Sequence, residues 1–314
     1  MNYAEALAYL DEHASYERTG RVDEPSLRNI SALVGLMGDP HNDYKVVHVT
    51  GTNGKGSTSQ IITKLLMAHG LRVGTYASPH LERINERILI DGRPIDDEVF
   101  AENLAAVADV EVLAAVRPSF FEILTAAALR CFSDTPVDVA VVEVGMLGRW
   151  DATNVVNADV AVITNIALDH TEYAGPTVLD IAREKVGIVK PDSVTVIGDV
   201  TPELAEFFSA AVPDALRRGE NFECADNHLA LGGRLIDVRT QHASYDDVFV
   251  PLHGRHQGDN ASAAIVAVES FFGHAIEREV LDEGLAMVSM PGRFEVLHHQ
   301  PLVIIDGAHN PAGA

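Results

Sequence analysis

One run of residues between two apolar segments has the composition of a phosphate-binding loop. The run is Thr50-Gly51-Thr52-Asn53-Gly54-Lys55-Gly56-Ser57-Thr58. Glycines let backbone N–H groups approach a phosphate, the N-terminus of a following helix adds partial positive charge, and Lys55 can neutralise phosphate oxygens. The spacing differs from GxxxxGK[ST], because Gly51 and Lys55 are too close together. A merely tight turn would need neither the lysine nor the hydroxyl, so the run predicts a nucleotide site.

A carboxylate and an imidazole lie at equivalent places further along the chain. Glu143 lies near the end of the apolar run VDVAVVEV, and His170 follows another in AVITNIALDH. In open α/β sheets ligands bind at the carboxyl ends of the strands, so we expect both side chains at the same edge as the phosphate loop. Mg²⁺ prefers oxygen ligands, and a histidine ligand would depend on the nucleotide. For either residue alone a capping or buried polar role is the favoured interpretation, but together with the loop they predict a magnesium site.

The elements that must position these residues alternate between apolar, β-branched runs and helical patterns. Strands are expected at 44–49, 72–77, 138–144, 160–163 and 194–197. Helices are expected at 3–13 and 27–37 before the first strand, and then at 57–70, 121–131 and 178–189. Short apolar strands alternating with helices predict an α/β protein whose mostly parallel sheet is covered on both faces.

The pattern of predicted elements changes after Asp199. A helix from Pro202 is followed by short strand-like pieces joined at Gly232-Gly233 and Tyr245-Asp246, which predicts a small antiparallel elaboration. Helices at 259–272 and 277–287 then lead to a new strand beginning at Pro301. We expect residues 1–293 to form one domain and residues 294–314 to begin a second α/β domain that the sequence does not complete.

Charge and cysteine content exclude several classes of function. The formal net charge is −23, from 23 basic and 46 acidic residues, which disfavours nucleic acid and anionic membranes as partners. Cys131 and Cys224 are far apart and form no CxxC pair, so we expect two reduced, buried thiols. No secretory signal is visible, and no apolar run reaches the ~20 residues needed to span a bilayer. A monomeric cytoplasmic protein acting on small molecules is the expectation.

Eight segments of the sequence match motifs of a known family. In chain order they are HVTGTNGKGS, SPHLERINERI, EVGMLGRWDATNVV, ITNIALDHTEYAG, IAREKVGIVKP, LHGRHQGDNASAA, PGRFEV and VIIDGAHNPAG. Together they resemble the folylpolyglutamate synthase and dihydrofolate synthase enzymes of the Mur ligase superfamily, over His48 to Ala314 and more loosely before it. The resemblance implies a P-loop-type ATPase domain at 1–293 and the start of a glutamate-ligase domain at 294–314. It also implies ATP-dependent addition of L-glutamate to dihydropteroate, to (tetrahydro)folate-polyglutamate or to both, through an acyl phosphate.

The resemblance further implies roles for individual residues, with Lys55, His170 and Lys185 as the catalytic set. Magnesium would be held by Ser78, Glu143 and His170. The nucleotide would contact Asn53, Gly54, Lys55, Gly56, Ser57, Asn260, Arg293 and Asp306. The pterin or dihydropteroate pocket would include Ser119, Phe120, Phe121, Arg149, Trp150, Asp151 and Ala152, while His309 would help to place glutamate. Taken alone, Phe120 and Phe121 are equally well explained as core residues.

Two positions carry particular expectations. Lys185 matches a lysine that this superfamily carries as a carbamate, which requires a neutral amine; without the resemblance it would be interpreted as a surface lysine. Leu147 stands where the family usually has a glycine, so a positive φ there would force the loop before Arg149 and Trp150 to rearrange.

Two alternatives remain open: a Mur-type ligase for another peptide precursor, and a truncated ATP-binding protein without ligase activity. Arg149, Asp151 and the LDHT segment favour some use of dihydropteroate. We expect the 314-residue chain to bind Mg-ATP weakly and to form no amide bond, with apolar Val303, Ile304 and Ile305 exposed.

Overall fold

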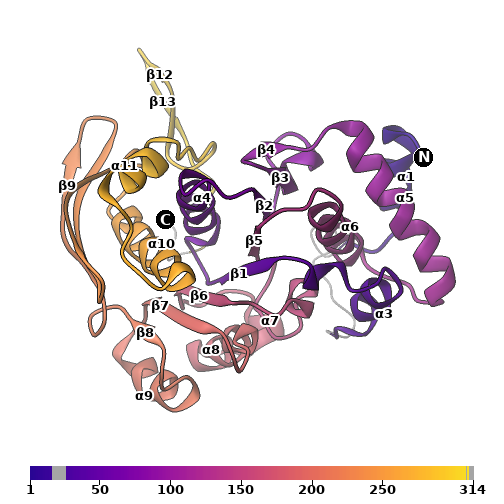
Figure 1. Ribbon diagram of the computed structural model, residues 1–314, viewed down its shortest axis with the longest axis horizontal. Coiled ribbons are helices and arrows are strands. Elements are labelled where there is room, and N and C mark those ends of the chain that lie inside the picture. Colours follow the sequence, from indigo (N-terminus) through magenta and orange to yellow (C-terminus); the bar gives the residue numbers. More distant parts are fainter. Residues whose placement is uncertain (16–25, 309, 311–314) are drawn as a thin grey trace.

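A computed structural model describes residues 1–15, 26–308 and 310, and its centre is one eight-stranded sheet (Figure 1). The strand order is β4-β3-β2-β5-β1-β6-β7-β8, and the neighbours from β2 to β8 are parallel. The strands are β1 (Lys45–Thr50), β2 (Val73–Tyr76), β3 (Ile88–Ile90), β4 (Arg93–Pro94), β5 (Val139–Glu143), β6 (Val160–Asn165), β7 (Val194–Asp199) and β8 (Leu216–Arg217). The predicted α/β class and parallel sheet are confirmed.

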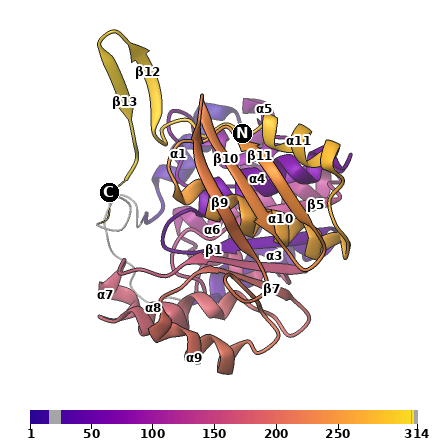
Figure 2. The same ribbon diagram turned by 90° about the vertical axis from the view of Figure 1, so that its left-hand side faces the viewer.

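One face of the sheet is covered by helices α4 (Lys55–Ala68), α10 (His256–Phe272) and α11 (Arg278–Ala286). Valines at alternate strand positions, such as Val47 and Val141, point into this core. Outside the helices lies the expected antiparallel elaboration, shown in Figure 2, of β9 (Glu223–Ala230), β10 (Gly233–Arg239) and β11 (Ser244–Val250).

The opposite face carries a second core, since the intervening strand residues, such as Val46 and Val142, point the other way. It is covered at one end by α1 (Tyr3–Asp11), α3 (Arg28–Leu36), α5 (Asp97–Ala114) and α6 (Phe120–Asp134). At the other end of this face a separate, smaller cluster packs under α8 (Val178–Lys185) and α9 (Pro202–Ala211). The sheet therefore separates two main cores, each with its own helices.

Short elements connect these layers. They are η1 (Pro40–Asn42), η2 (Ile84–Arg87), η3 (Ala152–Val155), η4 (Val186–Ile188) and α7 (Thr171–Ala174). Two helices that border the site begin at capping boxes, in which the Ser119 and Thr177 hydroxyls accept from the backbone N–H groups of Glu122 and Asp180. These caps fix where α6 and α8 start. Among the described residues, no helix combines the length and apolar character needed to cross a membrane.

Several expectations need correction. Helix α5 and strands β3 and β4 were not predicted. Cys131 is buried, but Cys224 is only partly so; both thiols are free. The strand expected from Pro301 is present as β13 (Leu302–Ile305), and it pairs antiparallel with β12 (Glu295–His299) as a hairpin.

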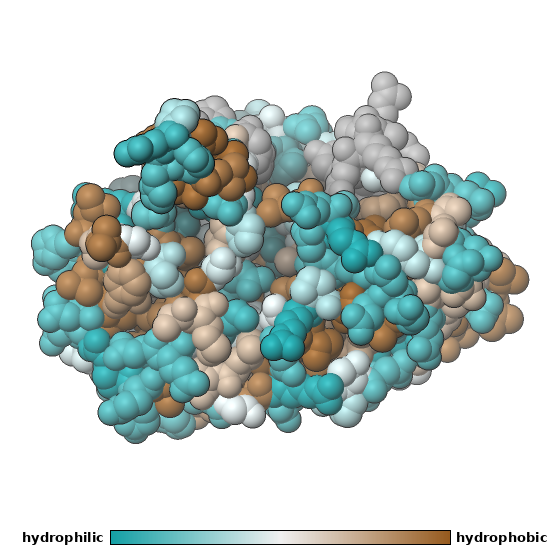
Figure 3. Space-filling view, turned by 90° about the horizontal axis from the view of Figure 1, so that it is seen from above, coloured by the Kyte–Doolittle hydropathy of each residue, from teal (hydrophilic) through white to brown (hydrophobic). Residues whose placement is uncertain are grey.

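The hairpin stands away from the body of the molecule in Figure 1. In Figure 3, which views the molecule from above, brown apolar surface is visible on the part that projects at the upper left. Val303, Ile304 and Ile305 are 40%, 38% and 41% exposed, as expected from the sequence. Its antiparallel pairing uses backbone hydrogen bonds between β12 and β13 alone, so it forms without covering these side chains.

Candidate active site

The phosphate loop joins β1 to α4. In the sheet, β1 lies between β5 and β6. Gly54 has φ +82°, and a side chain there would collide with that of Asn260. Gly51 leaves equally little room, because a Cβ would overlap the hydroxyl of Thr164. The glycines are therefore needed both for backbone conformation and for close approach. Helix α4 begins at Lys55, so its free N–H groups face the loop.

Hydrogen bonds from β6 hold this loop in place. The Asn53 N–H donates to Asn165 Oδ1 at 2.8 Å, and Thr164 Oγ1 donates to the Asn53 carbonyl at 2.6 Å. Lys55 Nζ donates to the carbonyls of Gly51 and Thr52, at 3.1 and 3.3 Å. The loop is thus preorganised, and the Lys55 ammonium lies over it.

Lys185, at the end of α8, is buried instead of lying on the surface. It is 2% exposed, and its Nζ donates to the Gly51 carbonyl at 2.7 Å. Burial, followed by the charge of Lys55, holds the pKa of the Lys185 amine well below its usual value. An amine in this setting is predisposed to lose its proton, which is the state that reacts with CO₂.

Glu143 ends β5 beside the start of α4. It is 4% exposed, and a Cβ built on Gly56 would lie 3.7 Å from Glu143 Oε2. Burial raises the pKa of Glu143 to about 7, although the charge of Lys55 and a hydrogen bond from the Ser78 N–H act in the opposite direction. The carboxylate therefore gains from a bound cation.

His170 follows β6 on the other side of the loop, with φ +48°. Burial lowers the pKa of its imidazole, which keeps the ring neutral and able to donate a lone pair. No group of three or more His, Cys, Asp or Glu side chains in the described part of the chain is arranged as a complete metal site. One carboxylate, the Ser78 hydroxyl and an imidazole beside a phosphate loop nevertheless fit Mg²⁺, which takes few protein ligands and fills its shell with phosphate and water oxygens.

A single cavity of about 1630 Å³ runs from the phosphate loop to α1 and α5. Most predicted site residues line it: Asn53, Gly54, Lys55, Gly56, Ser57, Ser78, Ser119, Phe120, Phe121, Glu143, Trp150, Asp151, Ala152, His170, Asn260, Arg293 and Asp306. Lys185 lies behind the wall, against the loop backbone. Arg149 is also off the wall, and its guanidinium donates to the Arg183 carbonyl at 3.2 Å. His309 lies outside the described residues.

Several residues on the wall have polar groups committed to structure. Asp151 accepts from the N–H and hydroxyl of Thr153 and from the Met146 N–H, at 3.0, 2.5 and 2.8 Å. Asp306 accepts from the N–H groups of Phe294 and Ala308, both at 2.7 Å. The carboxylates of both aspartates therefore fix loops as well as bordering the cavity.

The aromatic part of the wall comes from α6 and the loop after β5. Phe120 is 5% exposed and lies beneath the Arg87 guanidinium, whereas Trp150 is 48% exposed. Leu147 has φ +59°, which is the left-handed conformation that the sequence raised as a possibility. Its carbonyl accepts from Thr50 Oγ1 at 2.7 Å, so the turn before Trp150 is fixed to β1.

Other residues in or beside the cavity were not predicted. At the nucleotide end, Gln257 Nε2 donates to Ser57 Oγ at 3.3 Å, and Asn310 exchanges two side-chain hydrogen bonds with Asn53. Gln257 and Asn310 both lie in segments that carry the family resemblance, and that resemblance is the sequence signal that could have identified them. At the other end, Tyr9, His13 and Glu111 come from α1, the turn after it and α5. No motif marks these three.

Comparison with known proteins agrees with this geometry. The sequence family of the Mur ligase middle domain matches residues 95–268 of this chain. This defines the class, a Mur-type ligase fold around a nucleotide cavity.

Among curated proteins, the dihydrofolate synthase/folylpolyglutamate synthase of Mycobacterium tuberculosis is 43% identical, covering 94% of this chain and 65% of its own length. The folylpolyglutamate synthase of Lacticaseibacillus casei is 37% identical, and the match covers 100% of this chain and 75% of that protein. Among solved structures, the M. tuberculosis folylpolyglutamate synthase complexed with ADP has a TM-score of 0.91 at 41% identity, covering 99% of this chain and 71% of that one. The chain belongs to the dihydrofolate synthase/folylpolyglutamate synthase family.

Proposed function

We propose that the protein is an ATP-dependent ligase that joins L-glutamate to a pteroate-type carboxylate, either dihydropteroate or a folate with its glutamate tail. The observation that carries this proposal is that one continuous cavity is lined by the phosphate loop and Glu143 and, along the adjoining wall, by Phe120, Phe121 and Trp150. Relatives support it, since solved structures include a complex of FPGS with AMPPCP and folate. A cytoplasmic monomer remains our proposal for its setting.

The reaction would proceed in two steps. A substrate carboxylate oxygen attacks the γ-phosphorus of ATP, the bond to the bridging oxygen breaks, and ADP leaves with that electron pair. The amine of glutamate then attacks the carbonyl carbon of the acyl phosphate, releasing phosphate and the amine proton. Lys55 and the N–H groups at the start of α4 would hold the phosphates during the first step, which is electrostatic positioning.

Ser78, Glu143 and His170 would hold Mg²⁺, whose charge lowers the repulsion between the phosphate oxygens and the attacking carboxylate. We also propose that Lys185 carries a carbamate. The basis is its burial beside Gly51 and its lowered pKa, which together favour the neutral amine. Asn260, Arg293 and Asp306 would contact the nucleotide from the opposite side.

We propose a division of the chain at residue 293. Residues 1–293 contain the eight-stranded sheet and both cores, and residues 294–314 would begin the glutamate-binding domain. The exposed hairpin β12–β13 supports this, because its apolar side chains contribute to neither core. In this arrangement His309 would place glutamate.

The substrate class can be tested by equilibrium binding in the presence of AMPPCP and Mg²⁺. We expect dihydropteroate to bind and a nucleotide-sugar peptide, the substrate type of other Mur ligases, not to bind. The opposite preference would move the protein to another branch. Mass spectrometry of a reaction containing ATP, dihydropteroate and isotopically labelled glutamate would then show whether the chain itself forms the amide or only binds its substrates.

A further inference from the structure

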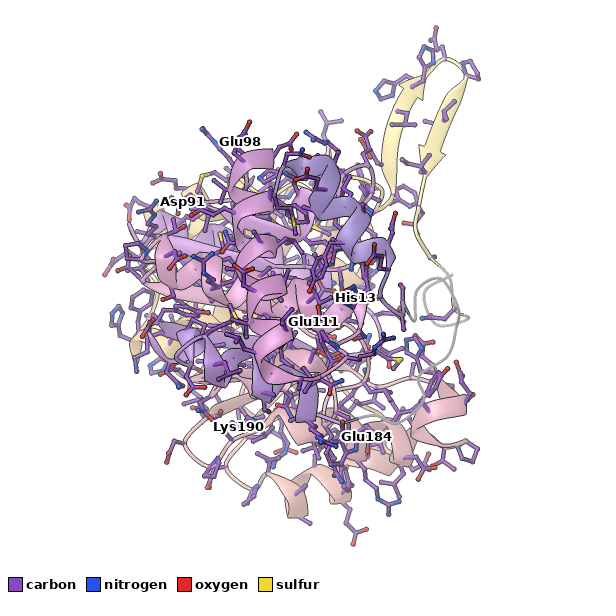
Figure 4. All side chains as sticks on the ribbon, turned by 90° about the vertical axis from the view of Figure 1, so that its right-hand side faces the viewer. His13, Asp91, Glu98, Glu111, Glu184 and Lys190 are labelled. Atoms are coloured by element: carbon purple, nitrogen blue, oxygen red, sulfur yellow. The ribbon has the colours of Figure 1, made fainter. Side chains whose placement is uncertain are left out.

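The end of the cavity farthest from the phosphate loop contains a carboxylate in an organised polar cluster. Glu111, near the end of α5, is 18% exposed at its side chain and lines the cavity together with Tyr9 and His13. Figure 4 shows His13 and Glu111 side by side, far from Glu98 at the other end of the same helix. None of the roles assigned above uses this cluster.

The hydrogen bonds fix the orientation of the Glu111 carboxylate. The Tyr9 hydroxyl donates to Oε2 at 2.5 Å, and His13 Nε2 lies 3.1 Å from Oε1 and 3.2 Å from Oε2. His13 Nδ1 is 2.8 Å from the Tyr9 carbonyl, which can only accept, so Nδ1 carries a proton. The other ring nitrogen, Nε2, faces the Glu111 carboxylate.

This arrangement leaves part of the carboxylate available. A carboxylate has about four lone-pair sites, and Tyr9 and His13 use about two of them. Tyr9 and His13 both belong to the N-terminal segment, so the other lone-pair sites of the Glu111 carboxylate point away from that segment. The exposed part of the Glu111 side chain borders the cavity. A ligand that offers two adjacent N–H donors would satisfy both oxygens at once.

The cluster is adjacent to the aromatic wall. The Phe120 N–H donates to the Ala14 carbonyl at 2.9 Å, which joins the turn after His13 directly to the start of α6. A flat ring resting along the Phe120–Phe121 wall would therefore present its edge toward Glu111. Glu12 and Arg117 also border the cavity, and in this orientation of the ring the reacting carboxylate would point toward Lys55.

We propose that Glu111, held by Tyr9 and His13, recognises the 2-amino and N3–H edge of a 2-amino-4-oxopteridine ring. This inference rests on the proposed function and adds the group that selects the ring. The 2-amino and N3–H groups are neighbouring donors in one plane, so they match a carboxylate in a two-point contact. Glu111 is thus a specificity residue for ring binding, remote from the phosphate chemistry.

The test compares pteroic acid with its counterpart in which a methyl group replaces the 2-amino group, measured by calorimetry with AMPPCP and Mg²⁺ present. We expect the unaltered protein to bind pteroic acid at least about tenfold more tightly. In Glu111→Gln this preference should fall to about twofold, because an amide offers one acceptor and one donor where two acceptors are needed. Glu98→Gln makes the same change of charge on α5 outside the cavity, and it should keep the full preference.

The outcomes separate the two proposals. Binding of both compounds with equal affinity by the unaltered protein would overturn the role of Glu111 while leaving the proposed function in place, and this measurement needs no variant to fold. Binding of neither compound would overturn both. A full preference retained in Glu111→Gln, with AMPPCP binding and thermal unfolding unchanged, would also overturn the assignment.

Discussion

Lys185 Nζ donates to the backbone carbonyl of Gly51, so the end of α8 is tied directly to the phosphate loop. Gly51 also accepts from Lys55 Nζ, and two lysine nitrogens therefore converge on one carbonyl oxygen. Two ammonium groups this close repel one another, which adds to burial in lowering the pKa of Lys185. The loop thus provides the setting in which the Lys185 amine is disposed to be neutral.

The first prediction concerns a carbamate on Lys185. In bicarbonate buffer, gentle intact-protein mass spectrometry should show a labile gain of one CO₂, and Lys185→Ala should abolish it. Lys190→Ala is the matched control, because Lys190 is also partly buried with a lowered pKa but contacts the Asn154 carbonyl instead. An adduct that persists in Lys185→Ala would exclude this site.

The second prediction concerns the charge over the phosphate loop. Lys55→Ala should weaken ADP binding by about 10- to 100-fold, since charge-assisted hydrogen bonds contribute about 1.5–3 kcal/mol. Calorimetry gives the affinity, and thermal unfolding should change by only a few degrees. Lys64→Ala, farther along α4, should bind ADP as the unaltered protein does. Unchanged binding in Lys55→Ala would remove Lys55 from the nucleotide site.

The third prediction uses the left-handed backbone at Leu147. Leu147→Gly and Leu147→Ala both lose a buried side chain, but only glycine relieves the strain at φ +59°. The glycine variant should therefore be more stable than the alanine variant by about 1 kcal/mol in denaturant unfolding. At Leu129, buried inside helix α6, the order should reverse, because alanine is the better helix former. The same order at both positions would contradict the strain.

The fourth prediction concerns pH and His48, which is fully buried on β1 with its Nε2 2.9 Å from Thr153 Oγ1. Because the Thr153 hydroxyl donates to Asp151, His48 Nε2 is the donor in this contact. Burial lowers the pKa of His48 to about 3. Between about pH 6.5 and 3 the unfolded chain binds a proton at this residue and the folded protein does not, so acid lowers the free energy of unfolding. The contribution of His48 should be complete above pH 6.5 and smaller by about 2 kcal/mol at pH 5.

His48→Gln keeps a donor for Thr153 and removes the titration. The difference in unfolding free energy between the unaltered protein and this variant should be constant above pH 7 and should shrink steadily below pH 6.5. Taking the difference removes the opposite contribution of Glu143, whose raised pKa favours the folded state in acid. A difference that does not change with pH would show that His48 is not buried in its neutral form.

The fifth prediction uses Trp150, the single tryptophan of the sequence. Since its ring is half exposed and borders the cavity, pteroic acid should change its fluorescence, and the titration should match the calorimetric affinity. Arg149→Ala should leave that affinity within about twofold, because the side chain is directed toward Arg183 and Glu184. A large loss in Arg149→Ala would mean that the guanidinium reaches the ligand after all.

The sequence predicted what is local and left out what depends on distant pairing. The strand, glycine loop and helix around Lys55 are contiguous, and Glu143 and His170 follow strands whose ends must meet at one edge. The Glu111–His13 contact joins residues 98 positions apart and requires α1 to lie against α5, a helix that was not predicted. The positive φ at Leu147 was raised as a possibility from the sequence, but the direction of the Arg149 side chain, toward Arg183 and Glu184, was not predicted.

The central sheet divides the protein into two cores, and the division also runs through the site. Helix α4, which begins at the phosphate loop, belongs to one core, while α6, which begins at Phe120, belongs to the other. Substitutions in separated regions usually have additive effects on stability. If the aromatic wall binds the ring as proposed, changes made from the α6 side should alter the acid substrate while α4 continues to present the same loop to the nucleotide.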